Sequence, residues 1–134
     1  MKKKSNIHFA KDIIQREISA LNRTIKRIDA RFEKACEVLN QTSGKVVTIG
    51  LGKSGYIAMK MAATLSSTGT SAVFIHATEA LHGDMGAINK NDTAIIYSNS
   101  GETQEIIKLL PLLKILKCSI ISITGNQSSS LAKY

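Results

Sequence analysis

Apolar residues recur at alternating four- and three-residue intervals along the first third of the chain. They are Ile14, Ile18, Leu21, Ile25, Ile28, Phe32, Ala35 and Leu39. This spacing places them on one face of a helix, with charged residues between them. We expect one long N-terminal helix that packs against the rest of the domain and against a second subunit, although the same spacing also fits a coiled-coil seam.

A polar segment, residues 40–44, ends this helical stretch. It closes with Gly44, and glycine readily takes the left-handed conformation that often terminates a helix. The sequence therefore predicts an N-terminal helical segment over residues 1–43 and a separate domain over residues 44–134.

Four short runs rich in β-branched residues follow Gly44. They cover residues 46–49, 72–75, 93–97 and 119–123. Continuous apolar runs of this length are typical of buried strands. Helical stretches at about residues 55–67 and 103–116 separate them, and such alternation indicates a parallel sheet with right-handed crossovers. The predicted fold class is α/β, a three-layer sandwich with a mostly parallel sheet of at least four strands.

Two features qualify this prediction. Pro111 lies inside the last predicted helix and should kink it or lie near a local break, because proline lacks one backbone donor. Residues 128–134 look like the start of a further helix, of only about two turns. We therefore expect the domain to be incomplete at its C-terminus.

Composition narrows the function classes. The 134 residues fit one domain, and no apolar run approaches the roughly 20 residues of a membrane span. No apolar signal core follows the basic N-terminus, so we expect a cytoplasmic protein that does not bind membranes. Cys36 and Cys118 lie in apolar segments without ligand spacing, which favours buried thiols.

The net charge of +8 favours phosphorylated or polyanionic partners, although several basic residues fall on the predicted N-terminal helix. Aromatic residues make up only 4% of the chain, and no basic residues interleave with them. Single-stranded nucleic acid binding depends on such stacking platforms, so a nucleic acid partner is not expected.

The first strand runs into Gly50-Leu51-Gly52-Lys53-Ser54-Gly55, a G-x-G-x-x-G motif between a strand and a helix. This placement is typical of a phosphate-binding turn, although glycines can also serve only a tight turn. A dinucleotide site also needs an acidic residue at the end of the second strand, which ends in His76 instead. A P-loop would need glycine at Val47. We therefore predict no cofactor.

The third strand runs into Ser98-Asn99-Ser100-Gly101-Glu102-Thr103, again at a strand-to-helix turn. Three hydroxyls, helix N-terminal amides and a glycine can together surround a phosphate without a basic residue. Helix capping explains one or two of these hydroxyls but hardly all three.

Three further side chains, His76, His82 and Asp84, fall in one predicted loop after the second strand. Their types suit zinc binding or proton relay, but their spacing matches no standard zinc motif. We favour contacts with a sugar or a role in ordering the loop, and predict no metal site.

Taken together, these segments resemble the arabinose 5-phosphate isomerases of the sugar isomerase (SIS) domain family. The resemblance covers residues 44–132 and rests on the Gly-Lys-Ser-Gly turn, the stretch 81–86 and the turn 98–102 in the family's order. It implies a flavodoxin-like SIS fold, interconversion of ribulose 5-phosphate and arabinose 5-phosphate, and a tetramer serving lipopolysaccharide or capsule synthesis. An SIS-type sugar-phosphate-binding or regulatory module without turnover is the alternative.

The resemblance also implies roles for single residues. Lys53 and Glu105 match two members of the family's catalytic group, whose other glutamate and histidine correspond to sequence beyond Tyr134. Substrate-binding residues would be Gly52, Ser54, His76, His82, Ser98, Asn99, Ser100, Glu102 and Thr103, with the hydroxyls of Ser54, Ser98, Ser100 and Thr103 on the phosphate. Read from the residues alone, Glu105 is also a favourable acid at the positive end of a helix.

Overall fold

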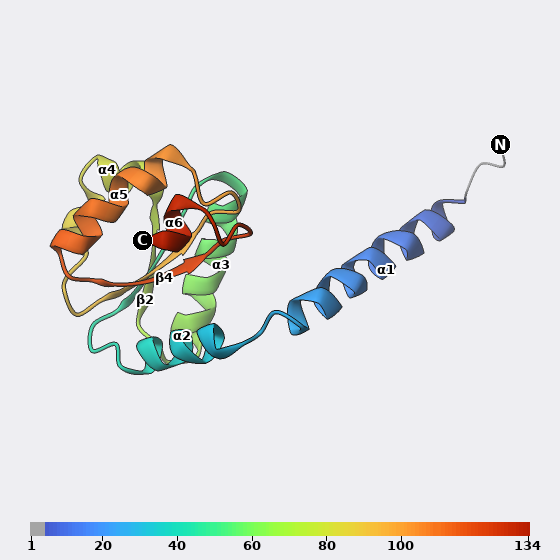
Figure 1. Ribbon diagram of the computed structural model, residues 1–134, viewed down its shortest axis with the longest axis horizontal. Helices are drawn as coiled ribbons and strands as arrows, with labels where there is room; N and C mark the ends of the chain where they lie inside the picture. Colours follow the sequence, from blue (N-terminus) through green and yellow to red (C-terminus); the bar gives the residue numbers. More distant parts are fainter. Residues whose placement is uncertain (1–4) are drawn as a thin grey trace. The chain divides into compact units, whose positions relative to one another are not determined.

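The computed structural model describes residues 5–134, which fall into two compact units divided between Cys36 and Glu37. The first unit is helical. The second holds a parallel sheet with helices on both faces (Figure 1). Within residues 5–134, no helix is both long enough and apolar enough to cross a membrane.

The N-terminal helical region consists of two helices rather than the single helix predicted over residues 14–39. Helix α1 runs Asn6–Ile25 and helix α2 runs Ala30–Asn40. The break has a local cause, because the Asp29 carboxylate accepts a hydrogen bond from the backbone N–H of Arg31 at 2.9 Å and also binds its guanidinium. An aspartate placed this way caps the start of a new helix, which outweighs the unbroken apolar spacing.

The apolar residues of helix α1 are exposed. Ser5 caps it by accepting a hydrogen bond from the backbone N–H of His8, and none of its residues is buried. The stripe residues Ile18 and Leu21 remain 43% and 65% exposed. The apolar residues predicted for this stretch therefore lie at exposed positions of α1.

The sheet of the second unit has four parallel strands in the order β2-β1-β3-β4. Their bounds are Val46–Gly50 for β1, Ala72–His76 for β2, Thr93–Tyr97 for β3 and Ser119–Ile123 for β4. The central strands β1 and β3 are buried along their whole length, whereas the edge strands β2 and β4 are partly exposed. The four predicted strands and the α/β fold class are confirmed.

Side chains from the strands point alternately to two cores. Val47 and Ile49 of β1 face α5 (Gln104–Ile115), which buries Ile106, Leu109, Leu110 and Leu113 in the same cluster. Val46 and Tyr97 face the opposite side, where they pack with Ala58 of α3 (Gly52–Ser67). Helices therefore cover both faces of the sheet, which is the predicted three-layer arrangement.

Two local predictions change. Helix α5 continues through Pro111 to Ile115 and does not break there, since buried leucines hold it on both sides of the proline. Gly44 does not take a left-handed conformation. Glycine is required there because no side chain fits. A β-carbon would collide with the Asp92 carboxylate and lie 2.8 Å from the Asn91 carbonyl oxygen.

The segment after β2 is helical rather than a loop. Helix α4 runs Ala77–Leu81, the 3-10 helix η1 runs Asp84–Ala87, and a short helix α6, Ser130–Lys133, ends the chain. Ala77 and Ala80 of α4 are buried in the α5 core. This burial explains why an alanine-rich segment between the two histidines folds into a helix.

Candidate active site

The fold brings the two glycine- and serine-rich turns to one place. Strands β1 and β3 are neighbours and parallel, so the turns that follow Gly50 and Tyr97 leave the same edge of the sheet. The chain then turns in opposite directions, from β1 through α3 to β2 and from β3 through α5 to β4. In open α/β sheets, ligands bind at such a switch point.

The first turn is shaped by close backbone contact. A β-carbon on Gly50 would lie 2.9 Å from the Cα of Gly55, so the end of β1 and the first turn of α3 approach this closely because Gly50 has no side chain. Gly52 begins α3 with φ +53°, a conformation that glycine adopts easily. Leu51 precedes it and offers no side-chain cap, which leaves the helix amides open to an anion.

The two polar side chains of this turn, Lys53 and Ser54, lie in the first turn of α3. Lys53 is exposed and Ser54 half-buried. Within residues 5–134, neither side chain makes a hydrogen bond or ion pair. Both are therefore free to bind a ligand at the switch point.

The second turn is held by a small hydrogen-bond network around Ser98. Its hydroxyl, only 3% exposed as a residue, accepts a hydrogen bond from the backbone N–H of Gly101 at 3.1 Å. It also lies 2.9 Å from the Thr103 hydroxyl, where either can be the donor. The exposed Ser100 hydroxyl accepts a hydrogen bond from the backbone N–H of Glu102 at 3.2 Å. Each hydroxyl is thus fixed in place before any ligand arrives.

Helix α5 begins at this turn. Thr103 is its N-cap residue but makes no side-chain hydrogen bond to the helix, so the first-turn amides are uncapped. Glu105, half-buried, lies in the same first turn. The N-termini of α3 and α5 thus both lie at this edge of the sheet, where their positive ends favour an anion.

A third segment, residues 124–131 after β4, completes the arrangement and was missed by sequence reasoning. Leu131 donates its backbone N–H to the carbonyl oxygen of Gly101 at 3.1 Å, and Gly125 donates to the carbonyl oxygen of Asn99 at 3.0 Å. The Ser130 N–H donates to Glu102 Oε1 at 2.8 Å. The signal that could have found it is its position, since β4 ends at the same edge as β1 and β3 and a Gly- and Ser-containing segment follows.

The Glu102 carboxylate is stabilised in its charged form. Hydrogen bonds from the backbone and side chain of Ser130, with a contribution from Lys133, lower the pKa of this carboxyl below its ordinary value. Its oxygen is therefore already bound within the protein, in contrast to the open side chains of the first turn.

The two histidines lie at opposite ends of α4. His76 precedes the helix and His82 follows it, so the whole length of the helix, at about 1.5 Å per residue, separates them. The His76 ring packs edge-on against Phe74 with 6.4 Å between ring centroids, and His82 is exposed. Among residues 5–134, no group of three or more His, Cys, Asp or Glu side chains is placed to hold a metal ion.

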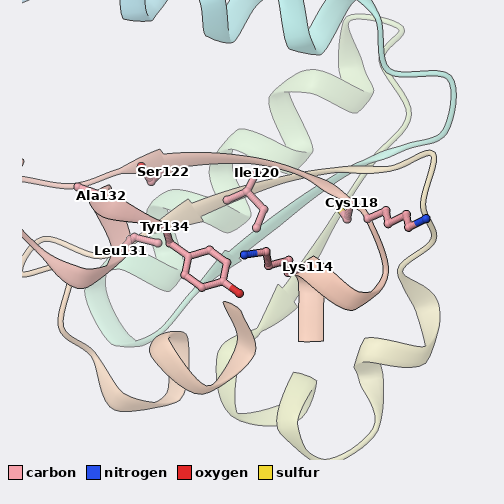
Figure 2. A pocket seen from close by; sticks show the side chains of 8 residues that line it. Lys114, Cys118, Ile120, Ser122, Leu131, Ala132 and Tyr134 are labelled. Atoms are coloured by element: carbon pink, nitrogen blue, oxygen red, sulfur yellow. The ribbon is translucent and has the colours of Figure 1, made fainter. Parts of the chain in front are cut away.

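A separate hollow of about 440 Å³ is lined by residues from the end of α5, from β4 and from α6. Its lining residues are Lys114, Lys117, Cys118, Ile120, Ser122, Leu131, Ala132 and Tyr134. Figure 2 shows the Tyr134 ring beside Lys114, whose Nζ lies 5.5 Å from the ring centroid. The Cys118 thiol is buried there and donates to the carbonyl oxygen of Asp92 at 3.2 Å, and burial raises its pKa. None of the predicted site residues lines this hollow.

The comparisons with known proteins identify the family of this chain. Residues 39–134 match the family model of the SIS domain. The chain is 51% identical over 127 residues to arabinose 5-phosphate isomerase KdsD of Pseudomonas aeruginosa, covering 95% of this chain and 39% of that protein. The KdsD isomerase of Escherichia coli K12 is 46% identical over 123 residues, covering 92% of this chain and 38% of the relative.

Solved structures include a similar protein with a ligand. An Escherichia coli CFT073 protein in complex with arabinose 5-phosphate superposes with a TM-score of 0.91 at 46% identity, covering 97% of this chain and 71% of that one. The chain thus spans about two fifths of the length of the curated relatives it matches.

Proposed function

This chain belongs to the SIS domain family, and on that premise we propose that it is the sugar-phosphate-binding part of an arabinose 5-phosphate isomerase. The observation that carries the proposal is the meeting of two uncapped helix N-termini and two hydroxyl- and glycine-rich turns at the switch point between β1 and β3. Curated relatives at 46–51% identity bear the name of that isomerase.

The phosphate is proposed to bind the turn after β3. When Ser98 accepts from Gly101 and donates to Thr103, the proton of Thr103 Oγ1 is free for a phosphate oxygen. The Ser100 hydroxyl accepts from the Glu102 amide, so its proton is free as well. The hydroxyls of Ser54, Ser100 and Thr103 and the α5 amides supply donors to an oxyanion without a buried counter-charge, while Ser98 orients Thr103. Gly52 would let the backbone approach, and Asn99 would contact the ligand from the rim of the turn.

The sugar end is proposed to react near Lys53 and Glu105. Isomerisation transfers the C2 proton of the aldose to a base, which gives an enediolate, or an enediol if the C1 oxygen gains a proton at the same time. The ketose forms when C1 gains a proton and the C2 hydroxyl loses its own, which leaves the carbonyl at C2. Glu105 could act as an acid or base, and the Lys53 ammonium would stabilise enediolate charge. His76 and His82 are proposed to contact the sugar.

Further proposals concern the oligomeric state, the cellular location and the pathway. The exposed apolar stripe of α1 suits a second copy of the chain, so we propose a homo-oligomer, with a tetramer as the expected size. A charged sugar phosphate does not cross membranes unaided, which favours a cytoplasmic enzyme. The resemblance to the arabinose 5-phosphate isomerases favours a role in the supply of lipopolysaccharide or capsule sugars.

The test measures binding and turnover separately. We expect the purified 134-residue chain to bind arabinose 5-phosphate in isothermal titration calorimetry, and a Ser100→Ala, Thr103→Ala double variant to weaken binding at least tenfold. A Ser19→Ala, Thr24→Ala variant on α1 is the matched control and should bind normally. Unchanged binding in the first variant would remove the phosphate assignment.

Turnover distinguishes an isomerase from a binding module. Ribulose 5-phosphate formation from arabinose 5-phosphate is therefore measured beside binding, with the same purified chain. In any longer form that is active, Glu105→Gln should lower kcat at least a hundredfold with little change in KM. Binding without turnover in that longer form would favour the regulatory module.

A further inference from the structure

We propose that Glu102 is a positioning residue, whose carboxylate holds the turn 98–103 in its binding shape by accepting the backbone N–H of Ser130. The inference rests on the proposed function of that turn as the phosphate site. It replaces the sequence-based expectation that Glu102 itself contacts the substrate.

Two adjacent hydrogen bonds join the turn to the start of α6. The Ser130 N–H lies 2.8 Å from Glu102 Oε1, and the Leu131 N–H lies 3.1 Å from the carbonyl oxygen of Gly101. Glu102 and Ser130 are 28 residues apart in sequence, so these bonds connect the segment after β3 with the segment after β4. A charge-assisted bond of this length is among the stronger hydrogen bonds of proteins.

Close packing supports the same junction. Ser129 is fully buried and occupies the space beside Gly101, where a β-carbon would also lie 2.9 Å from Thr124 Oγ1. The Gly101 backbone takes φ +69°, which a side chain disfavours. The conformation of the turn at Gly101 therefore depends on the packing of residues 124–131 against it.

Glu102 links this junction to the Ser100 hydroxyl, which is proposed to bind the ligand. Its N–H donates to Ser100 Oγ at 3.2 Å, while its carboxylate reaches the other way to Ser130. A shift of Glu102 would therefore move the acceptor bond that orients Ser100. It would also free a negative charge next to a phosphate, where like charges repel.

The junction offers two substitutions that remove one partner each. Glu102→Ala removes the acceptor. Ser130→Pro removes the donor, and it suits the site, because position 130 is the first residue of α6 and Ser129 before it is extended at φ −67°, ψ 161°. Glu102→Gln keeps an acceptor oxygen and tests rescue, and Glu33→Ala, an exposed first-turn acid of α2, is the control.

Titration calorimetry of the 134-residue chain with arabinose 5-phosphate, repeated with inorganic phosphate, tests the proposal. We expect Glu102→Ala and Ser130→Pro each to weaken binding about tenfold, and the combined variant to bind no more weakly than either alone. Glu102→Gln should stay within about threefold of wild type, and Glu33→Ala should not change binding. A combined loss of about a hundredfold, or normal binding by Ser130→Pro, would show that Glu102 acts on the ligand directly and overturn the proposal.

A spectroscopic signature separates positioning from general damage. In ¹H–¹⁵N spectra, the Ser130 amide should shift with acid as the Glu102 carboxylate protonates, and it should lose that dependence in Glu102→Gln. An invariant Ser130 amide would contradict the hydrogen bond itself. If wild type binds neither ligand, or if Ser100→Ala, Thr103→Ala binds normally, the phosphate site fails and this inference fails with it. Suppose instead that the Ser100→Ala, Thr103→Ala variant loses affinity as expected, but that the losses of Glu102→Ala and Ser130→Pro add up in the combined variant. Then the phosphate site stands and only the positioning role of Glu102 is overturned.

Discussion

The ammonium of Lys45 and the carboxylate of Asp92 form an ion pair of 2.8 Å where β1 and β3 begin, at the end of the sheet opposite the candidate site. The Asp92 side chain is only 2% exposed, and it also accepts the backbone N–H groups of Lys45 and Asn89. One buried carboxylate thus joins the starts of the two central strands.

We expect Asp92→Asn to lower the free energy of unfolding by about 3 kcal/mol, because it leaves the Lys45 charge without its partner and weakens two backbone hydrogen bonds. Urea unfolding at pH 7 measures the change. Asp29→Asn is the matched control, since its pair with Arg31 is exposed and asparagine still caps a helix. Its effect should stay within about 1 kcal/mol, and an equal loss in both variants would contradict the special role of Asp92.

The same pair predicts a pH dependence. Burial alone would raise the pKa of Asp92, but hydrogen bonds from Lys45 and Asn89 outweigh it and hold the pKa below its ordinary value. The unfolded chain therefore binds this proton more readily, with a pKa of about 3.9. The stabilisation should be complete above that value and be lost as the pH falls through the lower folded pKa. Urea titrations from pH 6 to pH 2.5 should show a steeper decline for wild type than for Asp92→Asn, and parallel curves would refute this prediction.

A substitution at Tyr97 should stabilise the protein. This residue is 7% exposed, and its hydroxyl is a buried oxygen without a hydrogen-bond partner among the described residues. A buried hydroxyl without a partner costs about 1–3 kcal/mol. We expect Tyr97→Phe to raise the free energy of unfolding by about 1 kcal/mol in urea, whereas the control Tyr56→Phe, at an exposed side chain, should change nothing. A loss of stability would mean that an ordered water satisfies the hydroxyl.

How much the sequence could predict differs between the strands and the N-terminal helices. Strands β1 and β3 are buried on both faces, so their apolar runs were a clear signal. The break between α1 and α2 left no such signal, because Ile25 and Ile28 keep the spacing of the stripe. It depends on a single cap, Asp29, which competes locally with the continuing helix.

The candidate site likewise has features that the sequence could predict and features that it could not. Both turns are continuous in sequence, so their residue types and their places after strands could be recognised. The bond between Glu102 and Ser130 joins residues 28 apart, and only the parallel packing of β3 and β4 brings them together. The histidines were expected in one loop, but the burial of Ala77 and Ala80 folds the segment between them into α4.

A pair of glycines tests whether the turn after β3 depends on its neighbour. Gly101 and Gly69 both have left-handed backbones, with φ +69° and φ +94°. Alanine costs about 1–2 kcal/mol at either position through backbone strain. At Gly69 nothing lies within 4 Å of the new β-carbon, whereas at Gly101 it would collide with Ser129.

We therefore expect Gly101→Ala to destabilise the protein by about 2 kcal/mol more than Gly69→Ala in urea unfolding, because relieving the collision unseats residues 124–131. Arabinose 5-phosphate binding should weaken at least tenfold in Gly101→Ala and stay unchanged in Gly69→Ala. Equal stability losses with equal affinities would mean that the turn keeps its shape without the segment after β4. Lost stability with normal affinity would instead confine the contact with Ser129 to folding and detach it from ligand binding.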